Sequence, residues 1–257
     1  MRRVRKAIVS LLGVGMLLAA TPSSAGAGAG GGTTIRAVVV KSWSLCDSWY
    51  VIWDTLNSSW QDYGSVPIEI DYSYPGLCDG SRVDYQTLVD SGADVVILSD
   101  PAGGLQAFSQ DEIKALSRYA REGHNVIGTY LAFSWRGFHN PGLAPLVGID
   151  EATRYGPSVS VTPAYDELEP DNSLFRNIPD PYVSSGLPVS QVPSDGLWDA
   201  GELAGARYVG KTSDSKAAIL VAQKPTYTGI YISTMPEYVG GTQDLQFFYN
   251  AITYGAN

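Results

Sequence analysis

Residues 93–130 read ADVVILSDPAGGLQAFSQDEIKALSRYAREGHNVIGTY, and this stretch decides the fold class. The apolar runs at its two ends, ADVVIL and NVIGTY, are typical of parallel strands buried on both faces. Between them, Ser109 and Glu112 form a capping-box pattern that begins a helix, and Gly123 stands where a left-handed C-cap ends it. Strand, helix and strand in this order predict a right-handed crossover in a parallel sheet.

The same alternation of strands and helices precedes residues 93–130. Residues 35–40 (IRAVVV) and 66–70 predict two more strands, and residues 46–61 and 83–89 predict two helices. Three tryptophans lie on one stripe of the first helix, so this stripe is expected to pack against the sheet. The predicted fold is a three-layer, flavodoxin-like α/β domain with a mostly parallel sheet and helices on both faces.

The second half of the chain has a different pattern. Residues 133–188 are rich in loops, with a short helix expected at 143–146 and a strand at 158–162. Three apolar segments separated by turns then predict adjacent antiparallel strands at the edge of the sheet. These segments are residues 206–209, 217–222 and 229–233. A last helix is expected over residues 242–254.

The N-terminal residues predict export. Four basic residues precede an apolar run at residues 7–20, and a small-residue cleavage site follows at Ala25. The run is shorter than the ~20 residues that span a bilayer, so the mature chain is expected to have no membrane span. The predicted organisation is a signal peptide at 1–25, a flexible Gly/Ala lead-in at 26–33 and a single domain at 34–257.

Charge and cysteine content fit a secreted protein. Four of the 17 Lys and Arg residues and none of the 26 Asp and Glu residues lie in the predicted signal, which leaves 13 bases against 26 acids. This balance argues against nucleic acid as a partner. Cys46 and Cys78 are expected to form a disulfide after export. A metal site would need further ligands, because His124 and His139 are the only histidines, and a cysteine nucleophile would need a histidine base nearby.

In an open parallel sheet, ligands bind beyond the carboxyl ends of the strands, and we call the residues at these ends the rim. The rim is rich in aromatic and polar side chains, which suit stacking on sugar rings. They are Trp43, Tyr72, Tyr74, Asp100, Tyr130, Phe133, Trp135, Arg136, Phe138, His139, Glu237 and Tyr238. The alternative is that the aromatic side chains close a lid over the sheet.

Two short motifs at the rim carry a family resemblance. The first is residues 128–132, GTYLA, and the second is residues 235–237, MPE. Together with the pair Gly103 and Gly104, they resemble the class I glutamine amidotransferase-like family. Residues 229–250 also resemble the ThuA-like branch. By order of elements, the resemblance covers most of the mature chain.

The resemblance implies a catalytic site that has lost its reacting groups. Gly103 and Gly104 stand where the family forms an oxyanion hole. Tyr130 replaces the family's nucleophilic cysteine and Met235 its histidine base, while Glu237 keeps the orienting acid. A phenol with a reference pKa near 10 and a thioether cannot perform this acyl transfer. The chain is therefore expected not to be a glutaminase.

The expected function is a secreted binding domain for a small polar or carbohydrate-like ligand, with no cofactor and no metal. The expected ligand-binding residues are Asp100, Gly103, Gly104, Tyr130, Trp135, Arg136, Glu237 and Tyr238. The candidates for any remaining catalysis are Glu237, Tyr130 and His139.

Other functions remain open. One is an extracellular hydrolase of sugars or peptides that uses Glu237, His139 or a metal, and another is a structural or surface-interaction module. Ser134 with His139 could form part of a triad, but no Gly-x-Ser-x-Gly elbow surrounds Ser134. Asp47, Asp71 and Asp100 could bind a hard cation, although helix capping is the simpler role.

Overall fold

A nine-stranded sheet forms the centre of the domain in the computed structural model. The structure describes residues 33–40, 51–72, 82–99, 108–129, 134–135, 138–139, 142–149, 154–155, 160–163, 173–184, 190–191, 206–212, 217–234, 236–238 and 240–255. All of them belong to one compact unit, Gly32–Asn257. The order of strands is β2-β1-β3-β4-β13-β12-β11-β8-β9.

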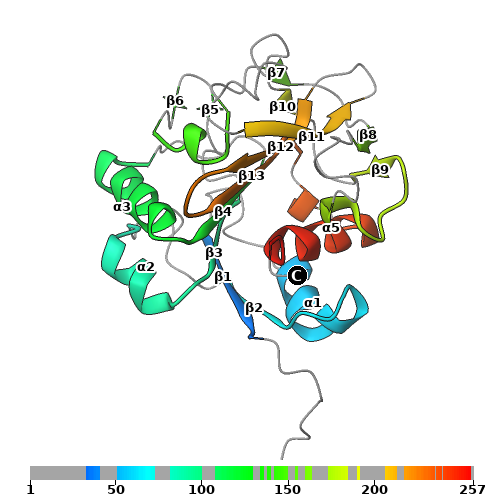
Figure 1. Ribbon diagram of the computed structural model, residues 1–257, viewed down its shortest axis with the longest axis horizontal. Coiled ribbons are helices and arrows are strands. Elements are labelled where there is room, and N and C mark those ends of the chain that lie inside the picture. The colour runs from blue at the N-terminus through cyan, green and yellow to red at the C-terminus, as the bar shows by residue number, and fades with distance from the viewer. Residues whose placement is uncertain are drawn as a thin grey trace, which may run out of the picture. The chain divides into compact units, whose positions relative to one another are not determined.

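The first five strands in this order are parallel, as the apolar runs predict (Figure 1). They are β2 (Ile68–Asp71), β1 (Ile35–Val40), β3 (Val95–Leu98), β4 (Asn125–Thr129) and β13 (Thr228–Ile232). All four residues of β3 are buried, because helices cover both faces of the sheet. The predicted α/β fold with a mostly parallel sheet and antiparallel strands at one side is confirmed.

The antiparallel part differs from the prediction in one strand. It contains β12 (Ala217–Gln223), β11 (Ala206–Thr212), β8 (Ser160–Pro163) and β9 (Tyr182–Val183). The third expected edge segment forms β13, which pairs antiparallel with β12 but parallel with β4. β13 therefore lies inside the sheet, and the edge strand on this side is β9. The apolar sequence of β13, TGIYI, indicates a buried strand but does not specify which strands lie beside it.

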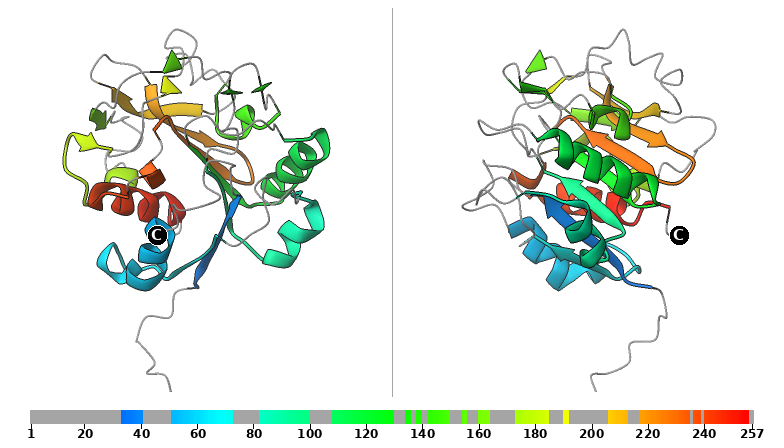
Figure 2. Two further views of the ribbon diagram at one scale, coloured as in Figure 1. Left: turned by 180° about the vertical axis from the view of Figure 1, so that it is seen from behind. Right: turned by 90° about the vertical axis from the view of Figure 1, so that its left-hand side faces the viewer.

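Of the helices that the structure describes, two cover each face of the sheet (Figures 1 and 2). α2 (Tyr85–Ser91) and α3 (Gln110–Arg121) lie on one face, and α1 (Val51–Ser59) and α5 (Thr242–Ile252) lie on the other. Trp53 of α1 is 1% exposed and meets Phe248 of α5 edge-on, with 4.9 Å between ring centroids. This contact confirms for Trp53 that the stripe on the first helix packs in the core.

The ends of these helices follow the sequence signals. Ser109 and Glu112 make both hydrogen bonds of a capping box at the start of α3, and Gly123 adopts φ +115° after its end. α1 is described from Val51 and continues into a short 3-10 helix, η2 (Trp60–Asp62). α2 lies two residues later than expected, because Asp84 caps it by accepting a hydrogen bond from the Thr87 amide.

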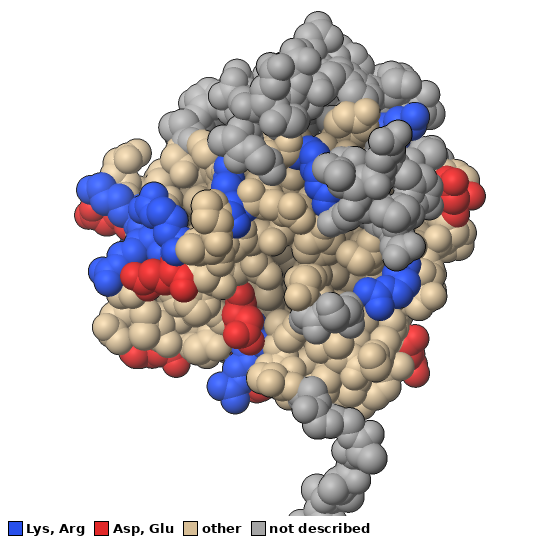
Figure 3. Space-filling model, in the orientation of Figure 1, with Lys and Arg blue, Asp and Glu red and all other residues tan. Residues whose placement is uncertain are grey.

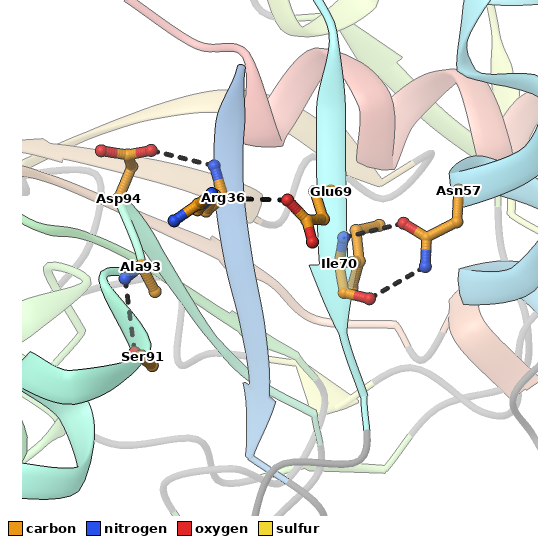
Figure 4. Close-up of polar contacts among 7 residues, drawn as sticks. All are labelled: Arg36, Asn57, Glu69, Ile70, Ser91, Ala93 and Asp94. Carbon is orange, nitrogen blue, oxygen red and sulfur yellow. Dashed lines mark hydrogen bonds and ion pairs between the residues drawn. The ribbon is translucent and has the colours of Figure 1, made fainter. Parts of the chain in front are cut away.

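Polar side chains form contacts with β2, with β1 and with the residue that precedes β3 (Figure 4). The Arg36 amide donates to Asp94 Oδ2 at 2.9 Å, and Arg36 Nε lies 3.5 Å from Glu69 Oε2. On the edge strand β2, the Ile70 amide donates to Asn57 Oδ1 at 2.7 Å, and Asn57 Nδ2 donates to the Ile70 carbonyl at 2.9 Å. The Asn57 side chain thus takes the place of a further strand.

The remaining elements are short. β5 (Ser134–Trp135) pairs with β6 (Phe138–His139), and β7 (Arg154–Tyr155) pairs with β10 (Ser190–Gln191). Among the described residues, three further 3-10 helices accompany them: η3 (Ala144–Leu146), which confirms the expected short helix, η4 (Ser173–Phe175) and η6 (Pro236–Tyr238). Across the described ranges, no helix has the length and apolar character needed to cross a membrane.

Candidate functional site

The candidate site is a buried carboxyl group at the carboxyl ends of three adjacent strands. Ser99 follows β3, Thr129 ends β4, and Glu237 lies on η6, shortly after β13. Glu237 Oε1 accepts hydrogen bonds from Ser99 Oγ at 2.6 Å and from Thr129 Oγ1 at 2.5 Å. The parallel order of these strands brings together groups that lie up to 138 residues apart in the sequence.

Burial dominates the electrostatics of Glu237. The residue is 2% exposed, and Ser99 and Thr129 are fully buried. Loss of hydration raises the pKa of the Glu237 carboxyl from 4.5 to about 7, although the hydrogen bonds from Ser99 and Thr129 oppose this shift. The negative charge of Asp244 adds to the increase, and no Lys, Arg or His of the described ranges counters it. At neutral pH, a large fraction of the molecules therefore carries a neutral carboxylic acid here.

Two buried polar atoms, one directly after β13 and one on η6, lack hydrogen-bond partners among the described residues. Glu237 Oε2 and Ser233 Oγ make no hydrogen bond within the part of the chain that the structure describes. An unsatisfied buried polar atom costs about 1–3 kcal/mol, so native proteins keep few of them, often at functional sites. The end of β13 and η6 therefore provide two atoms that could bind a ligand.

A second buried polar network supports the first. Tyr182 of β9 donates to Asp244 Oδ1 at 2.5 Å, and Asp244 Oδ2 accepts from the Gly241 amide at 3.2 Å at the start of α5. Ser184 donates to Thr234 Oγ1 at 3.1 Å. Burial, and next the charge of Asp244, raise the pKa of Tyr182 well above its usual value, so its phenol stays a donor. These contacts connect the edge strand, α5 and the residues after β13.

The structure describes only some of the expected site residues. Glu237 lies at the carboxyl rim with its side chain described. Tyr238 on η6, Trp135 on β5 and His139 on β6 are placed by their backbones, and Ser134 pairs with His139 across the hairpin. The other predicted residues lie outside the described ranges: Cys46, Cys78, Asp100, Gly103, Gly104, Tyr130 and Arg136.

Ser99 and Thr129 were not predicted as site residues. Each is the first polar side chain after the buried part of an apolar run, ADVVIL in one case and NVIG in the other. A hydroxyl group that remains fully buried at the end of a strand needs a partner. This signal could have indicated a polar group between the two strands, but not that the group would be Glu237.

Two hollows of the described surface lie away from Glu237. One, of about 410 Å³, lies at the amino ends of the strands and is lined by residues such as Asp94 and Asn125. The other, of about 590 Å³, lies between α2 and α3 and is lined by Arg82, Lys114 and Arg118, among others. Figure 3 shows acidic and basic side chains interspersed over these helices.

The charges around the larger hollow are largely paired. Arg82 lies 3.0 Å from the buried Glu112, Lys114 lies 3.2 Å from Asp111, and Arg118 lies 3.0 Å from Glu122. This hollow therefore offers no excess of one charge to attract an ion. In the described ranges, no group of three or more His, Cys, Asp and Glu side chains could hold a metal ion.

Comparisons with known proteins identify the fold. No protein-family model matches the sequence, and no curated protein does. Among solved structures, a ThuA-like protein from Bacteroides uniformis has a TM-score of 0.53 at 14% identity, over 90% of this chain and 94% of that one. The fold is ThuA-like. This supports the resemblance of the sequence to the class I glutamine amidotransferase-like family at the level of the fold.

Two proteins from Salmonella typhimurium are also similar in structure to this chain. The cytoplasmic protein STM3548 has a TM-score of 0.54 at 12% identity, and the cytoplasmic protein STM1381 has a TM-score of 0.54 at 9% identity. Each comparison covers 86% of this chain and 98% of the other. At such low identity the ThuA-like fold does not specify an activity, so the function must be argued from the site.

Proposed function

We propose that this chain is an exported binding domain with a ThuA-like fold, without glutaminase activity, that takes a small neutral polar ligand such as a carbohydrate at the rim. The observation that carries this proposal is the Glu237 carboxyl. It is held by Ser99 and Thr129 through one oxygen, while the other oxygen has no partner in the described ranges. A polar group fixed by its neighbours, with one atom left for a ligand, is typical of a binding site.

The sequence around Glu237 supports binding rather than glutaminase chemistry. In the resemblance, Tyr130 and Met235 stand at the places of the family's cysteine and histidine. A tyrosine and a methionine do not supply the nucleophile and the base that glutaminase chemistry requires. We propose that the aromatic rings of Tyr130, Trp135 and Tyr238 stack on the ligand. The polar contacts would come from Asp100, Arg136, Glu237 and the amides of Gly103 and Gly104.

Export is part of the proposal. It rests on the basic and apolar N-terminal segment and on the two cysteines, Cys46 and Cys78, which we propose to form a disulfide. Intact-mass measurement of the protein purified from culture medium is expected to give a chain that begins near Gly26, with a mass lowered by two hydrogens. A full-length or reduced chain would contradict export or the disulfide, respectively.

Thermal-shift measurement with a panel of neutral mono- and oligosaccharides tests the binding function. A ligand that binds the native state raises the melting temperature, and at one hundred times its Kd it adds about 2.7 kcal/mol to stability. Glu237→Ala is expected to remove this response. Glu69→Gln is the matched control, because Glu69 is exposed on the edge strand β2. No response across the panel would refute the proposal.

A hydrolase is the second candidate, and one observation favours it. A carboxyl group with a pKa of about 7 can act as a general acid at neutral pH. If the protein hydrolyses glycosides, Glu237→Gln is expected to lower kcat by about 100-fold or more, in proportion to the contribution of such an acid. Turnover that is unchanged in this variant would exclude Glu237 as the acid.

A further inference from the structure

The two oxygens of Glu237 have different surroundings. Oε1 accepts hydrogen bonds from two fully buried hydroxyl groups, which occupy the lone pairs that a carboxyl oxygen presents. Oε2 is buried as well, but it has no partner in the described ranges. When the group is neutral, the proton therefore belongs on Oε2, where it can be donated to a further molecule.

We propose that ligand binding at this site is linked to a proton: Glu237 donates its Oε2 proton to a neutral oxygen acceptor of the ligand, such as a sugar hydroxyl or ring oxygen. This inference rests on the proposed binding function and narrows it to uncharged ligands. Ser233 Oγ, the other unpartnered atom of the same segment, provides a second hydrogen-bonding group.

The charges that face Glu237 favour the neutral acid. Asp244 is fully buried, and its charge acts on both Glu237 and Tyr182. None of the causes of the Glu237 shift is a basic residue. A carboxylate or phosphate ligand would add a further negative charge close to Asp244, which costs free energy in a buried setting. A neutral ligand adds no charge.

The sequence gives a reason for this state. In the family that the motif resembles, the place of Met235 holds a histidine, whose imidazolium could offset a nearby carboxylate. Methionine carries no charge. Position 235 therefore provides no cation that would favour the ionised form of Glu237.

Isothermal titration calorimetry tests the proposal. The probes are glucose, mannose, galactose and N-acetylglucosamine as neutral sugars, and glucuronate as the matched anion. With a pKa of about 7, nearly all molecules carry the proton at pH 5.5 and about 3% carry it at pH 8.5. A neutral sugar that requires the proton is therefore expected to bind about thirtyfold more weakly at pH 8.5. Glucuronate is expected to bind more weakly than glucose at both pH values.

Two variants test whether the proton that is linked to ligand binding belongs to Glu237. Glu237→Gln cannot titrate, so the ratio of the two affinities is expected to fall from about thirtyfold to near one. Glu69→Gln, which changes an exposed carboxylate on β2, is expected to keep the wild-type ratio. If Glu237→Gln does not fold, titration of the wild-type protein at pH 7.5 in phosphate and in Tris counts the protons directly. Binding is then expected to take up about three quarters of a proton, because about one quarter of the free molecules already carry it at this pH.

The outcomes separate this inference from the proposed function. Sugars that bind with equal affinity at pH 5.5 and 8.5 would overturn the proton linkage but leave the binding function intact. Tighter binding at pH 8.5, or a thirtyfold ratio that survives in Glu237→Gln, would also overturn the linkage. If none of the neutral sugars binds at either pH, the binding function and the linkage fail together.

Discussion

Replacing Glu237 by glutamine is expected to change how the stability of the ligand-free protein depends on pH. The folded-state pKa of about 7 exceeds the ordinary value of 4.5, so between these two pH values the folded state binds more protons than the unfolded state. Stability then falls as pH rises, because ionisation must occur inside the protein. The contribution of the neutral acid to the free energy of unfolding is fully present below pH 4.5 and is lost as the pH rises through about 7.

The size of this effect follows from the same two values. Between pH 4.5 and about 7, each pH unit lowers the free energy of unfolding by about 1.4 kcal/mol, which gives a total decrease of about 3 kcal/mol. Glu237 is 2% exposed, so solvent screens this cost little. Glutamine at this position remains neutral at every pH. The wild-type free energy of unfolding, relative to that of Glu237→Gln, is therefore expected to decrease by about 3 kcal/mol from pH 4.5 to pH 8.

Urea denaturation at pH 4.5, 5.5, 6.5, 7.5 and 8 measures this difference. Ser233→Ala is the matched control, since it removes an unpartnered hydroxyl from the same buried segment without changing a titratable group. Its curve is expected to run parallel to that of the wild type. If the curves of wild type and Glu237→Gln are also parallel, Glu237 does not titrate in this range, and the argument from its burial is wrong.

The hydrogen bond from Ser99 provides a further test of the same carboxyl. This bond lowers the pKa of Glu237, and Ser99→Ala removes it without adding a charge. The pKa of Glu237 is therefore expected to rise above about 7, and the loss of stability extends to higher pH. Carbon-13 NMR titration of the Glu237 carboxyl measures the shift. A lower pKa in Ser99→Ala would show that another interaction controls the group.

Three further predictions concern the scaffold, and urea denaturation measures each of them. Asn57→Ala leaves the outer backbone groups of β2 without their two hydrogen bonds and is expected to cost about 1–3 kcal/mol; Asn57→Asp, which keeps the acceptor, should cost less. Gly229→Ala would place a Cβ 1.9 Å from the Leu146 carbonyl oxygen, so a loss of about 3 kcal/mol is expected, and an unchanged midpoint would refute this close approach. Ser109→Ala removes the cap of α3 and is expected to cost about 1 kcal/mol, whereas Ser109→Asp should retain most of it.

The sequence predicts the parallel half of the fold well, because its signals are local. The run VVIL of β3 is buried on both faces, and the capping box at Ser109 begins α3 at the expected residue. The place of β13 could not be read in this way. Its pattern shows burial, but its pairing with β4 depends on how a strand about one hundred residues away is placed in the sheet.

The site shows the same division between local and distant information. Glu237 could be proposed from the MPE motif and its position after a strand. Its partners Ser99 and Thr129 could not, because they belong to β3 and β4 and reach Glu237 only through the order of the strands. The same holds for Tyr182 and Asp244, which meet across 62 residues.

The position of Glu237 restricts what this fold can do at the rim. A strand end in a parallel sheet is a place where side chains from several crossovers meet, and a carboxyl group there normally needs a cation or water to remain ionised. Here two neutral hydroxyl groups hold it, and a second acid lies within electrostatic reach. An ionised Glu237 would thus be the costly state. With a pKa of about 7, the neutral form of Glu237 is well populated at neutral pH, and this form can donate a hydrogen bond to an uncharged oxygen, as we propose for the ligand.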